Sequence, residues 1–283
     1  MLKKIIYGMA KLNDHKYGYG SGISKKKYNY SYLLNYLNSQ KKIQSIEISK
    51  RYKNSIKSSF ELKSKNIHYK IDKISKNKKL IKKIIINEID EYTKFSKKNI
   101  DILYLHQNQL SIISNLEVLK ILEEIKFLKK IKHIGVSIYN LKELNFALKS
   151  KVINVIQLPV NVADSYLYSK IPVNSKKIFI ARSIYLQGAL INNLDSHPKK
   201  KELQKYIINL KNICKKNNTD YFNTITSYPF NLKKISYVII SSIYKKNLEK
   251  IFKSIKIINK RKMDTIFHSS KKYKSWQNPR NWN

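Results

Sequence analysis

The sequence predicts an α/β protein with a (β/α)8 architecture, a TIM barrel, built as a single domain. Short apolar runs alternate with longer amphipathic segments along the chain, and the apolar runs number eight. Most of these runs lack the apolar–polar alternation of half-exposed strands, which is typical of parallel strands covered on both faces. Eight such strands separated by helices indicate the barrel.

The predicted strands are short, rich in β-branched residues and bounded by polar residues. They span residues 4–8, 43–48, 67–71, 102–105, 131–136, 152–157, 178–181 and 237–240. The fourth run has no helical period and stops at His106. Barrel enzymes hold their chemistry at the C-terminal ends of strands, so His106 is a candidate site residue. The ordinary alternative at such a position is a hydrogen-bonded structural histidine.

Amphipathic segments between these runs predict the helices. They span residues 30–37, 80–92, 115–129, 141–148, 203–213 and 246–257. The clearest is 115–129, in which leucine or isoleucine recurs every three residues. Asn140 precedes the segment 141–148 and is predicted to be its N-cap.

A doubly wound open sheet is the rival fold, and it would require a glycine-rich turn directly after the first strand. The segment 18–22 contains three glycines, but it begins ten residues beyond Gly8 and no helix opens on it. We therefore interpret this segment as a flexible loop and not as a dinucleotide-binding fingerprint.

The longest interval between predicted strands, 181–237, contains one helical pattern and a polar stretch at 217–226. Residues 261–283 contain Trp276 and Trp282. Because two exposed tryptophans in a loose tail would be unusual, this segment is predicted to be a C-terminal arm packed across the barrel. No change in composition marks a boundary, so residues 1–283 are predicted to form one domain.

The formal net charge of +40 invites a nucleic-acid function, because basic side chains neutralise phosphates. Nearly all of this charge is lysine, whereas recognition of bases and phosphates favours the planar guanidinium of arginine. The lysines are also spread along the whole chain. A genome rich in A and T explains a composition high in Lys, Ile, Asn and Tyr. We therefore expect neither a specific nucleic-acid partner nor a membrane partner.

One cysteine, Cys214, excludes an intramolecular disulfide and fits a reducing, cytoplasmic compartment. No apolar stretch approaches the roughly 18 residues that a membrane span requires. The first residues are basic but lack a long apolar region, so we interpret them as leading into the first strand and not as a signal peptide.

Polar side chains end nearly every predicted strand and are expected to meet on one rim. In chain order they are Glu47, Tyr52, Lys70, His106, Ser137, Gln157, Arg182, Ser183, Ser241 and Ser242. A lysine beside a tyrosine favours the ionised phenol, so the tyrosine releases its proton more readily. A carboxylate fixes the lysine, and a neutral histidine orients a carbonyl. This set suits a general acid that protonates a carbonyl oxygen while a cofactor delivers hydride to carbon. The scattered histidines predict no metal site.

Over essentially its whole length the chain resembles the aldo-keto reductase family, and in particular one bacterial branch of it. The segments that carry the resemblance are 8–12 with 17–20, 46–55, 100–106, 134–140, 155–161, 181–188 and 278–282. Singly these segments are weak signals, but all of them occur in order and at barrel spacing. The resemblance implies a (β/α)8 barrel that reduces aldehydes and ketones with NADPH, or with NADH in some members.

The resemblance also implies roles for single residues. Tyr52 would donate the proton, Lys70 would tune the tyrosine, Glu47 would pair with Lys70, and His106 would orient the carbonyl. The cofactor would be held by Ser137, Gln157, Arg182, Ser183, Gly188, Ser241, Lys245 and Lys246. Within this set, Ser137 and Gln157 would hold the nicotinamide carboxamide, and Lys245 and Lys246 a 2′-phosphate. Independently of the family, the scarcity of glycine leads us to expect all six glycines on or near this rim, with ordinary turns as the alternative for Gly18 and Gly22.

The chain departs from the family at several of these positions. Glu47 stands where the family has aspartate, Ile138 where many members have asparagine, and Ser241 where a glycine is common. These departures motivate the main alternative, a barrel of the same descent that has lost redox activity and serves as a binding or scaffold protein. A nucleic-acid binder is a third hypothesis, and the identity of the carbonyl substrate is not predicted.

Overall fold

Eight parallel strands close into a barrel, with each strand paired to its neighbours in sequence and the last paired to the first. The strands of this computed structural model are β1 (Lys4–Gly8), β2 (Ile43–Ser49), β3 (Asn66–Ile71), β4 (Ile100–Leu105), β5 (His133–Ser137), β6 (Ile153–Pro159), β7 (Ile178–Arg182) and β8 (Ile235–Ile240). The structure describes residues 4–13, 30–52, 55–63, 65–72, 74, 78–107 and 109–282. The predicted barrel and all eight predicted strands are confirmed.

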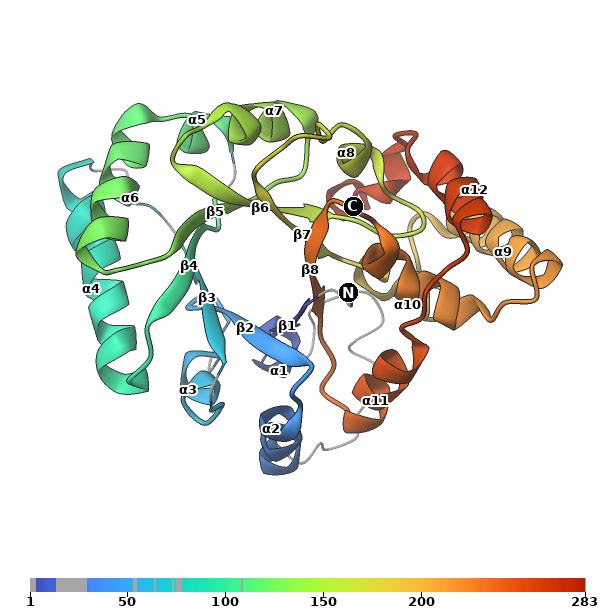
Figure 1. Cartoon of the computed structure of the whole chain (residues 1–283), viewed down its shortest axis with the longest axis horizontal. Helices are drawn as coiled ribbons and strands as arrows, with labels where there is room; N and C mark the ends of the chain where they lie inside the picture. Colours follow the sequence, from blue (N-terminus) through green and yellow to red (C-terminus); the bar gives the residue numbers. More distant parts are fainter. Residues whose placement is uncertain are drawn as a thin grey trace.

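Helices surround the barrel (Figure 1). In the described residues they are α1 (Ala10–Asn13), α2 (Tyr30–Ser39), α3 (Ser55–Phe60), α4 (Lys78–Ser96), α5 (Leu110–Ile113), α6 (Leu116–Leu128), α7 (Leu141–Lys149), α8 (Tyr166–Ser169), α9 (Lys200–Lys216), α10 (Tyr221–Asn231), α11 (Lys245–Ser254) and α12 (Lys260–Ser270). Short 3-10 turns add η2 (Leu186–Gly188), η3 (Ser275–Gln277) and η4 (Pro279–Asn281). All six predicted helices are present.

The interval between β7 and β8 differs from the prediction of one helix and a polar stretch. The polar stretch enters a second helix, α10, whose residues 224–230 are buried. Asp220 caps this helix, since its carboxylate accepts a hydrogen bond of 2.7 Å from the backbone N–H of Asn223. Threonine, serine and Pro229 inside α10 hide the helical period, which is why the sequence reads as a loop.

The protein has two separate apolar cores, one outside the barrel wall and one inside it. The larger core lies between the strands and the surrounding helices. The smaller core fills the barrel interior with Ile6, Ile102, Tyr104, Val155 and Ile180. Because side chains alternate along a strand, the residues two positions after these also face inward, which brings polar strand ends together above the inner core.

Gly135 explains how the inner core accommodates the ring of Tyr104. A Cβ atom at Gly135 would lie 2.6 Å from the Cε1 atom of that ring. This glycine therefore makes space in the barrel interior for the Tyr104 ring, two residues before Ser137 at the end of β5.

The C-terminal segment packs against the barrel through its two tryptophans, each 9% exposed. The ring centroid of Trp276 lies 5.5 Å from that of Tyr206 on α9, and the Trp282 ring lies 4.3 Å from His197. The Trp282 indole N–H donates to the carbonyl of Trp276 at 2.8 Å. The prediction that both tryptophans are packed is confirmed.

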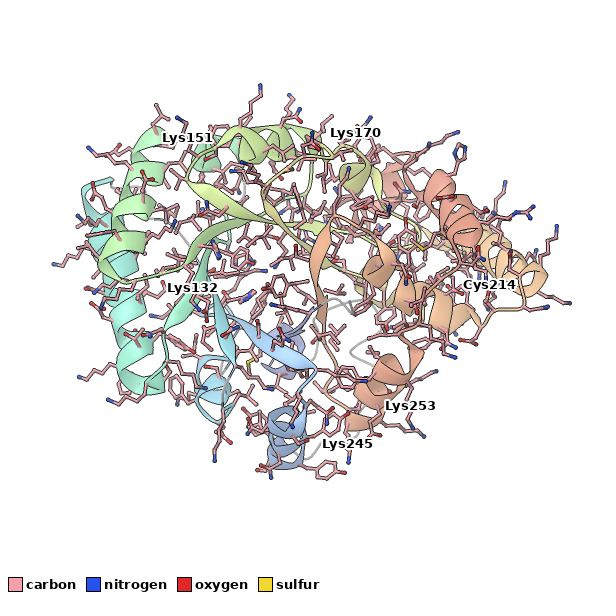
Figure 2. All side chains as sticks on the ribbon, in the orientation of Figure 1. Lys132, Lys151, Lys170, Cys214, Lys245 and Lys253 are labelled. Atoms are coloured by element: carbon pink, nitrogen blue, oxygen red, sulfur yellow. The ribbon has the colours of Figure 1, made fainter. Side chains whose placement is uncertain are left out.

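Lysine side chains project from many sides of the molecule, as Figure 2 shows for Lys151, Lys170, Lys245 and Lys253. This distribution agrees with charge that is spread along the sequence and not gathered in one patch. Across the described ranges, none of the helices has the length and apolar character that crossing a membrane requires.

Candidate active site

Three polar side chains from different strands, two of them buried and one nearly so, meet at the C-terminal end of the barrel. The Lys70 ammonium, at the end of β3, donates to Glu47 Oε1 and to Gln157 Oε1, each at 2.8 Å. The Gln157 amide N–H donates to the second oxygen of Glu47. The side chains of Lys70 and Glu47 are 8% and 12% exposed, and Gln157 is fully buried. These contacts close a triangle among β2, β3 and β6.

The electrostatics of this triangle follow from its burial and its pairing. Burial by itself would raise the pKa of Glu47, because a carboxylate loses solvation in the protein interior. The charge of Lys70, together with hydrogen bonds from Lys70 and Gln157, outweighs this effect and leaves the pKa lowered. Glu47 is therefore an anion at neutral pH, as the pairing with Lys70 requires.

A chain of hydrogen bonds extends the triangle toward β5 and β7. The Ser137 hydroxyl donates to Gln157 Oε1 at 3.0 Å and accepts from Arg182 Nε at 3.1 Å. The same guanidinium donates to the carbonyl of Ile138 at 2.8 Å and to Ser183 Oγ at 3.3 Å. Arg182 thus ties the ends of β5 and β7 together.

Tyr139 and Arg280 join this group, although neither is among the predicted site residues. The Arg182 and Arg280 guanidinium carbons lie 3.9 Å and 3.5 Å from the centroid of the Tyr139 ring. The charge of Arg182 is the main cause that lowers the pKa of Tyr139, with burial opposing it and Arg280 assisting. The presence of Tyr139 and Arg280 in two segments of the resemblance is the sequence signal that could have suggested both.

Tyr52 and His106 lie beside each other at the same end of the barrel, with ring centroids 6.1 Å apart. Burial, with the positive charges of Lys70 and Arg51, lowers the pKa of His106 to about 4. The imidazole is therefore neutral at neutral pH. Within the part of the chain that the structure describes, its buried Nδ1 has no hydrogen-bond partner.

The loop after β7 has an unusual backbone. Ser183, Leu186 and Gln187 adopt left-handed conformations with φ values of 55°, 48° and 52°, and Gly188 follows with φ of 100°. Such conformations cost energy in non-glycine residues and cluster at functional sites. Leu186 N–H donates to the Ser183 carbonyl at 2.8 Å, which closes the turn beside Arg182.

The residues predicted after β8 divide into two groups. The Ser241 hydroxyl donates to the Gly8 carbonyl at 2.7 Å and so stays near the barrel end. The Lys245 ammonium instead donates to the hydroxyl of Tyr32 on α2 at 2.7 Å. Lys246 is exposed at the start of α11, and no described residue pairs with it. The glycine-rich segment 18–22 lies outside the described residues.

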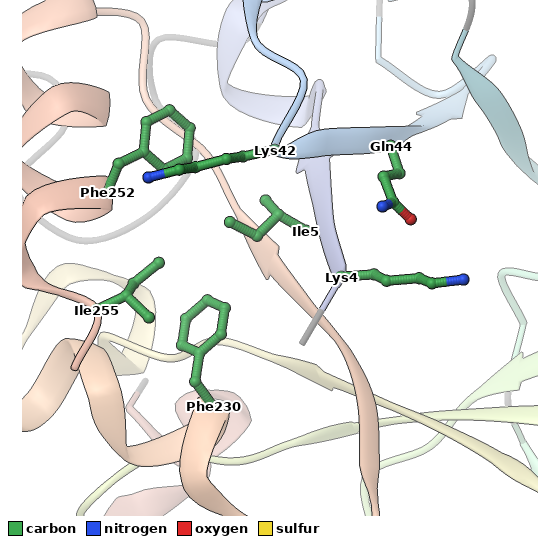
Figure 3. A pocket seen from close by; sticks show the side chains of 7 residues that line it. All are labelled: Lys4, Ile5, Lys42, Gln44, Phe230, Phe252 and Ile255. Atoms are coloured by element: carbon green, nitrogen blue, oxygen red, sulfur yellow. The ribbon is translucent and has the colours of Figure 1, made fainter. Parts of the chain in front are cut away.

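A small cavity of about 150 Å³ lies at the opposite end of the barrel, where β1 and β2 begin. Figure 3 shows Ile5, Phe230 and Ile255 at its apolar wall and the Lys42 side chain running beside Phe252. Among the described residues, no acidic side chain lines this cavity. It is therefore separate from the polar cluster at the C-terminal strand ends.

Comparison with known proteins decides the family. The model of the Aldo/keto reductase family matches residues 19–267. The chain belongs to this family. No curated protein sequence matches this aldo/keto reductase significantly.

Solved structures show the same fold at low sequence identity. A glycerol dehydrogenase from Gluconobacter oxydans matches with a TM-score of 0.69 and 13% identity, over 96% of this chain and 94% of the other. The holo form of an aldo-keto reductase from Bacillus halodurans matches with a TM-score of 0.73 and 12% identity, over 98% and 96% of the two chains. Its apo form gives a TM-score of 0.66 and 15% identity, over 88% and 87%.

The donor set of this aldo/keto reductase is compatible with the nicotinamide cofactor of its family. Gln157 has a second amide hydrogen that no described residue accepts, so it can donate to a carboxamide oxygen. A neutral His106 beside Tyr52 provides polar groups for a carbonyl. No cluster of three or more His, Cys, Asp or Glu side chains suited to a metal ion occurs in the described ranges.

Proposed function

We propose that the protein reduces an aldehyde or ketone with NADPH, with Tyr52 as the proton donor. Two observations carry this proposal: the Glu47–Lys70 ion pair at the strand ends, and the adjoining rings of Tyr52 and His106 at the same end of the barrel. A carbonyl held between Tyr52 and His106 would meet a phenol and a neutral imidazole. Both groups can donate hydrogen bonds to its oxygen.

Each residue of the cluster has a distinct part in this proposal. Tyr52 gives its proton to the carbonyl oxygen as the alcohol forms, and the cation of Lys70 stabilises the resulting phenolate. Glu47 holds Lys70 in place through the 2.8 Å contact. His106 orients the carbonyl, and its low pKa keeps it from competing with Tyr52 as an acid at neutral pH. The bound cofactor supplies the hydride that reaches the carbonyl carbon.

The cofactor would lie along the ends of β5 to β8. Ser137 and Gln157 would bind the carboxamide, with Arg182 holding Ser137 in position. Ser183 and Gly188, in the left-handed loop after β7, would approach the pyrophosphate.

The adenosine end of the cofactor would reach the start of α11. Lys246 and the N-terminus of this helix suit a 2′-phosphate, because helix N-termini bind anions. Lys245 would support it only after leaving Tyr32. This arrangement favours NADPH, with NADH as the alternative. We also infer a cytoplasmic, reducing location, since Cys214 is a buried free thiol.

The experiment compares NADPH oxidation by the wild-type protein and Tyr52→Phe, with benzaldehyde and glyceraldehyde as substrates. Loss of a positioned general acid should lower kcat at least about a hundredfold. Tyr273→Phe is the matched control, because this exposed tyrosine lies in the C-terminal segment and should leave the rate unchanged.

Equal, slow oxidation by the wild type and Tyr52→Phe would contradict the proton-donor role. If NADPH also failed to quench the protein fluorescence, the scaffold alternative would replace the enzyme. The buried side chain of Ile138, in place of an amide that could hold the cofactor, is the observation that would then explain the loss.

A further inference from the structure

A second cavity, which we call the α3–α4 cavity, lies between these two helices on the outer side of β3. Its volume is about 360 Å³, in the range of cavities that bind small molecules. Its lining comprises five aromatic residues, two glutamates, two lysines and one isoleucine: Tyr52, Phe60, Tyr69, Tyr92, Phe95, Glu88, Glu91, Lys50, Lys57 and Ile56. The inner core and the Glu47–Lys70 pair face the other side of β3, since Tyr69 and Lys70 are adjacent in the strand.

The carboxylate of Glu88 lines this aromatic cavity. Glu88 is only 9% exposed. Its Oε1 accepts a hydrogen bond of 2.9 Å from the Tyr69 hydroxyl. Its Oε2 accepts a hydrogen bond from none of the described residues. This oxygen is not among the fully buried unpaired atoms of the described residues, so it is open to the cavity and can accept a hydrogen bond from a bound cation.

The lysines at the cavity do not fill this role. Lys50 pairs with Glu91 at 3.2 Å, and both side chains are more than half exposed at 56% and 60%. Lys57 is exposed at the end of α3. The carboxylate of Glu88 therefore faces the cavity without a direct ion-pair partner among the described residues.

We propose that the α3–α4 cavity binds a small organic cation, a primary ammonium on an aryl or alkyl body, with Glu88 as its counter-ion. The ammonium would donate to Glu88 Oε2, and the apolar body would lie against the rings of Phe60, Tyr92 and Phe95. Aromatic faces attract cations, and the carboxylates of Glu88 and Glu91 repel anions. The occupant would also contact Tyr52, which lines the cavity.

Titration calorimetry with benzylammonium chloride as the probe tests this site without any nicotinamide cofactor. The wild type should bind benzylammonium, whereas benzyl alcohol and benzoate should bind at least about tenfold more weakly. Glu88→Gln should weaken benzylammonium binding about tenfold or more. Glu123→Gln, which removes an exposed carboxylate on α6 outside the cavity, is the matched charge control and should bind like the wild type.

A second pair of variants protects the test against unfolding of Glu88→Gln. Phe95 is 62% exposed, so Phe95→Leu should fold normally and weaken binding about threefold through the lost cation–π contact. Phe127→Leu is its control, since Phe127 is 85% exposed on α6. Wild-type affinity in both Glu88→Gln and Phe95→Leu, or benzoate binding as tightly as benzylammonium, would overturn the proposal. So would the absence of benzylammonium binding at millimolar concentrations.

Discussion

Glu47 shows how one longer side chain can be accommodated in a buried ion pair. Where the resemblance implies an aspartate, the glutamate still reaches Lys70 at 2.8 Å, and its second oxygen takes the N–H of Gln157. The extra methylene therefore does not separate the charges. It brings the carboxylate within reach of an amide that the resemblance assigns to the cofactor, so Gln157 serves both groups.

Removing one partner of this pair should be costly, because the other charge stays buried alone. Lys70→Met should lower the free energy of unfolding by about 3 kcal/mol, measured by urea denaturation at neutral pH. The double variant Glu47→Gln/Lys70→Met should recover most of this loss, because no unpaired charge is left.

The exposed pair Lys50–Glu91 provides the control for this prediction. Its side chains are 56% and 60% exposed, so Lys50→Met should cost less than about 1 kcal/mol. A Lys70→Met variant no less stable than Lys50→Met would show that the buried pair contributes nothing special to stability.

His68 makes the stability of the barrel depend on pH. It is 2% exposed below Lys70, and burial lowers its pKa to about 4. In the unfolded chain a histidine binds its proton near pH 6.5. Between these values protons bind preferentially to the unfolded chain, so stability falls as the pH falls. When the pH is lowered from about 7 to about 4.5, the free energy of unfolding of His68→Gln should therefore fall by about 2 kcal/mol less than that of the wild type.

The effect of His68 is measured as a difference between the wild type and the variant, because other buried groups make stability rise as the pH falls. Burial raises the pKa of Asp164 to about 7, so this residue favours the folded chain as the pH falls. Urea unfolding curves at the two pH values, for the wild type and His68→Gln, isolate the histidine. If the free energy of unfolding depended on pH equally in the two proteins, His68 would not be a source of the pH dependence.

At the scale of elements, the chain ends helices without glycine. After α6, Lys130 adopts φ of 51°, and Ile131 N–H bonds the Lys126 carbonyl at 2.9 Å. Asn218 has φ of 50° after α9, with the matching bond from Thr219 N–H to the Cys214 carbonyl at 2.9 Å. These are Schellman motifs, in which glycine normally occupies the left-handed position.

A glycine at this position should stabilise the protein, because the left-handed conformation costs a lysine about 1 kcal/mol. Lys130→Gly should raise the free energy of unfolding by about 0.5–1 kcal/mol, measured by chemical denaturation. Lys129→Gly is the control at φ of −100°, and there glycine should be destabilising, because it gains no conformational relief and removes the ion pair between Lys129 and Asp90 at 2.6 Å. Equal effects of the two substitutions would contradict the account of this helix end.

Elements with a strong period could be predicted from the sequence, and elements with a mixed composition could not. The segment 115–129 shows its leucine and isoleucine spacing directly, and Asn140 caps α7 with a capping box, as its position suggested. Helix α10 escaped prediction because buried Thr224, Thr226 and Ser227 look like loop residues. Burial by neighbouring elements overrides the weak local preference of such residues.

The candidate site was predictable where strand ends alone bring residues together. Glu47, Lys70 and Gln157 meet because parallel strands present their C-terminal ends on one side. The stacking of Arg280 on Tyr139 depends on the path of the C-terminal segment, which no local pattern encodes. For the same reason, Lys245 was expected at the cofactor, whereas its ammonium bonds Tyr32 on α2.

At the scale of the whole molecule, the net charge of +40 opposes folding through repulsion among lysines. Salt at about 0.1 M screens charges beyond roughly 10 Å. The Tm should therefore rise by about 5 °C when sodium chloride is increased from about 0.02 M to 0.3 M at constant pH. Sucrose at equal osmolality is the uncharged control. A Tm that is constant or falls with salt would show that the lysines are too dispersed to destabilise the fold.

In the proposed reaction, hydride moves from the cofactor to a carbonyl carbon while Tyr52 supplies the proton. Mass spectrometry of the alcohol formed from benzaldehyde, with NADPH deuterated at its transferable hydrogen, tests this most directly. We predict an alcohol that carries one deuterium on carbon, formed at least about a hundredfold more slowly by Tyr52→Phe. An alcohol without deuterium, or no alcohol from the wild-type protein, would contradict the claim.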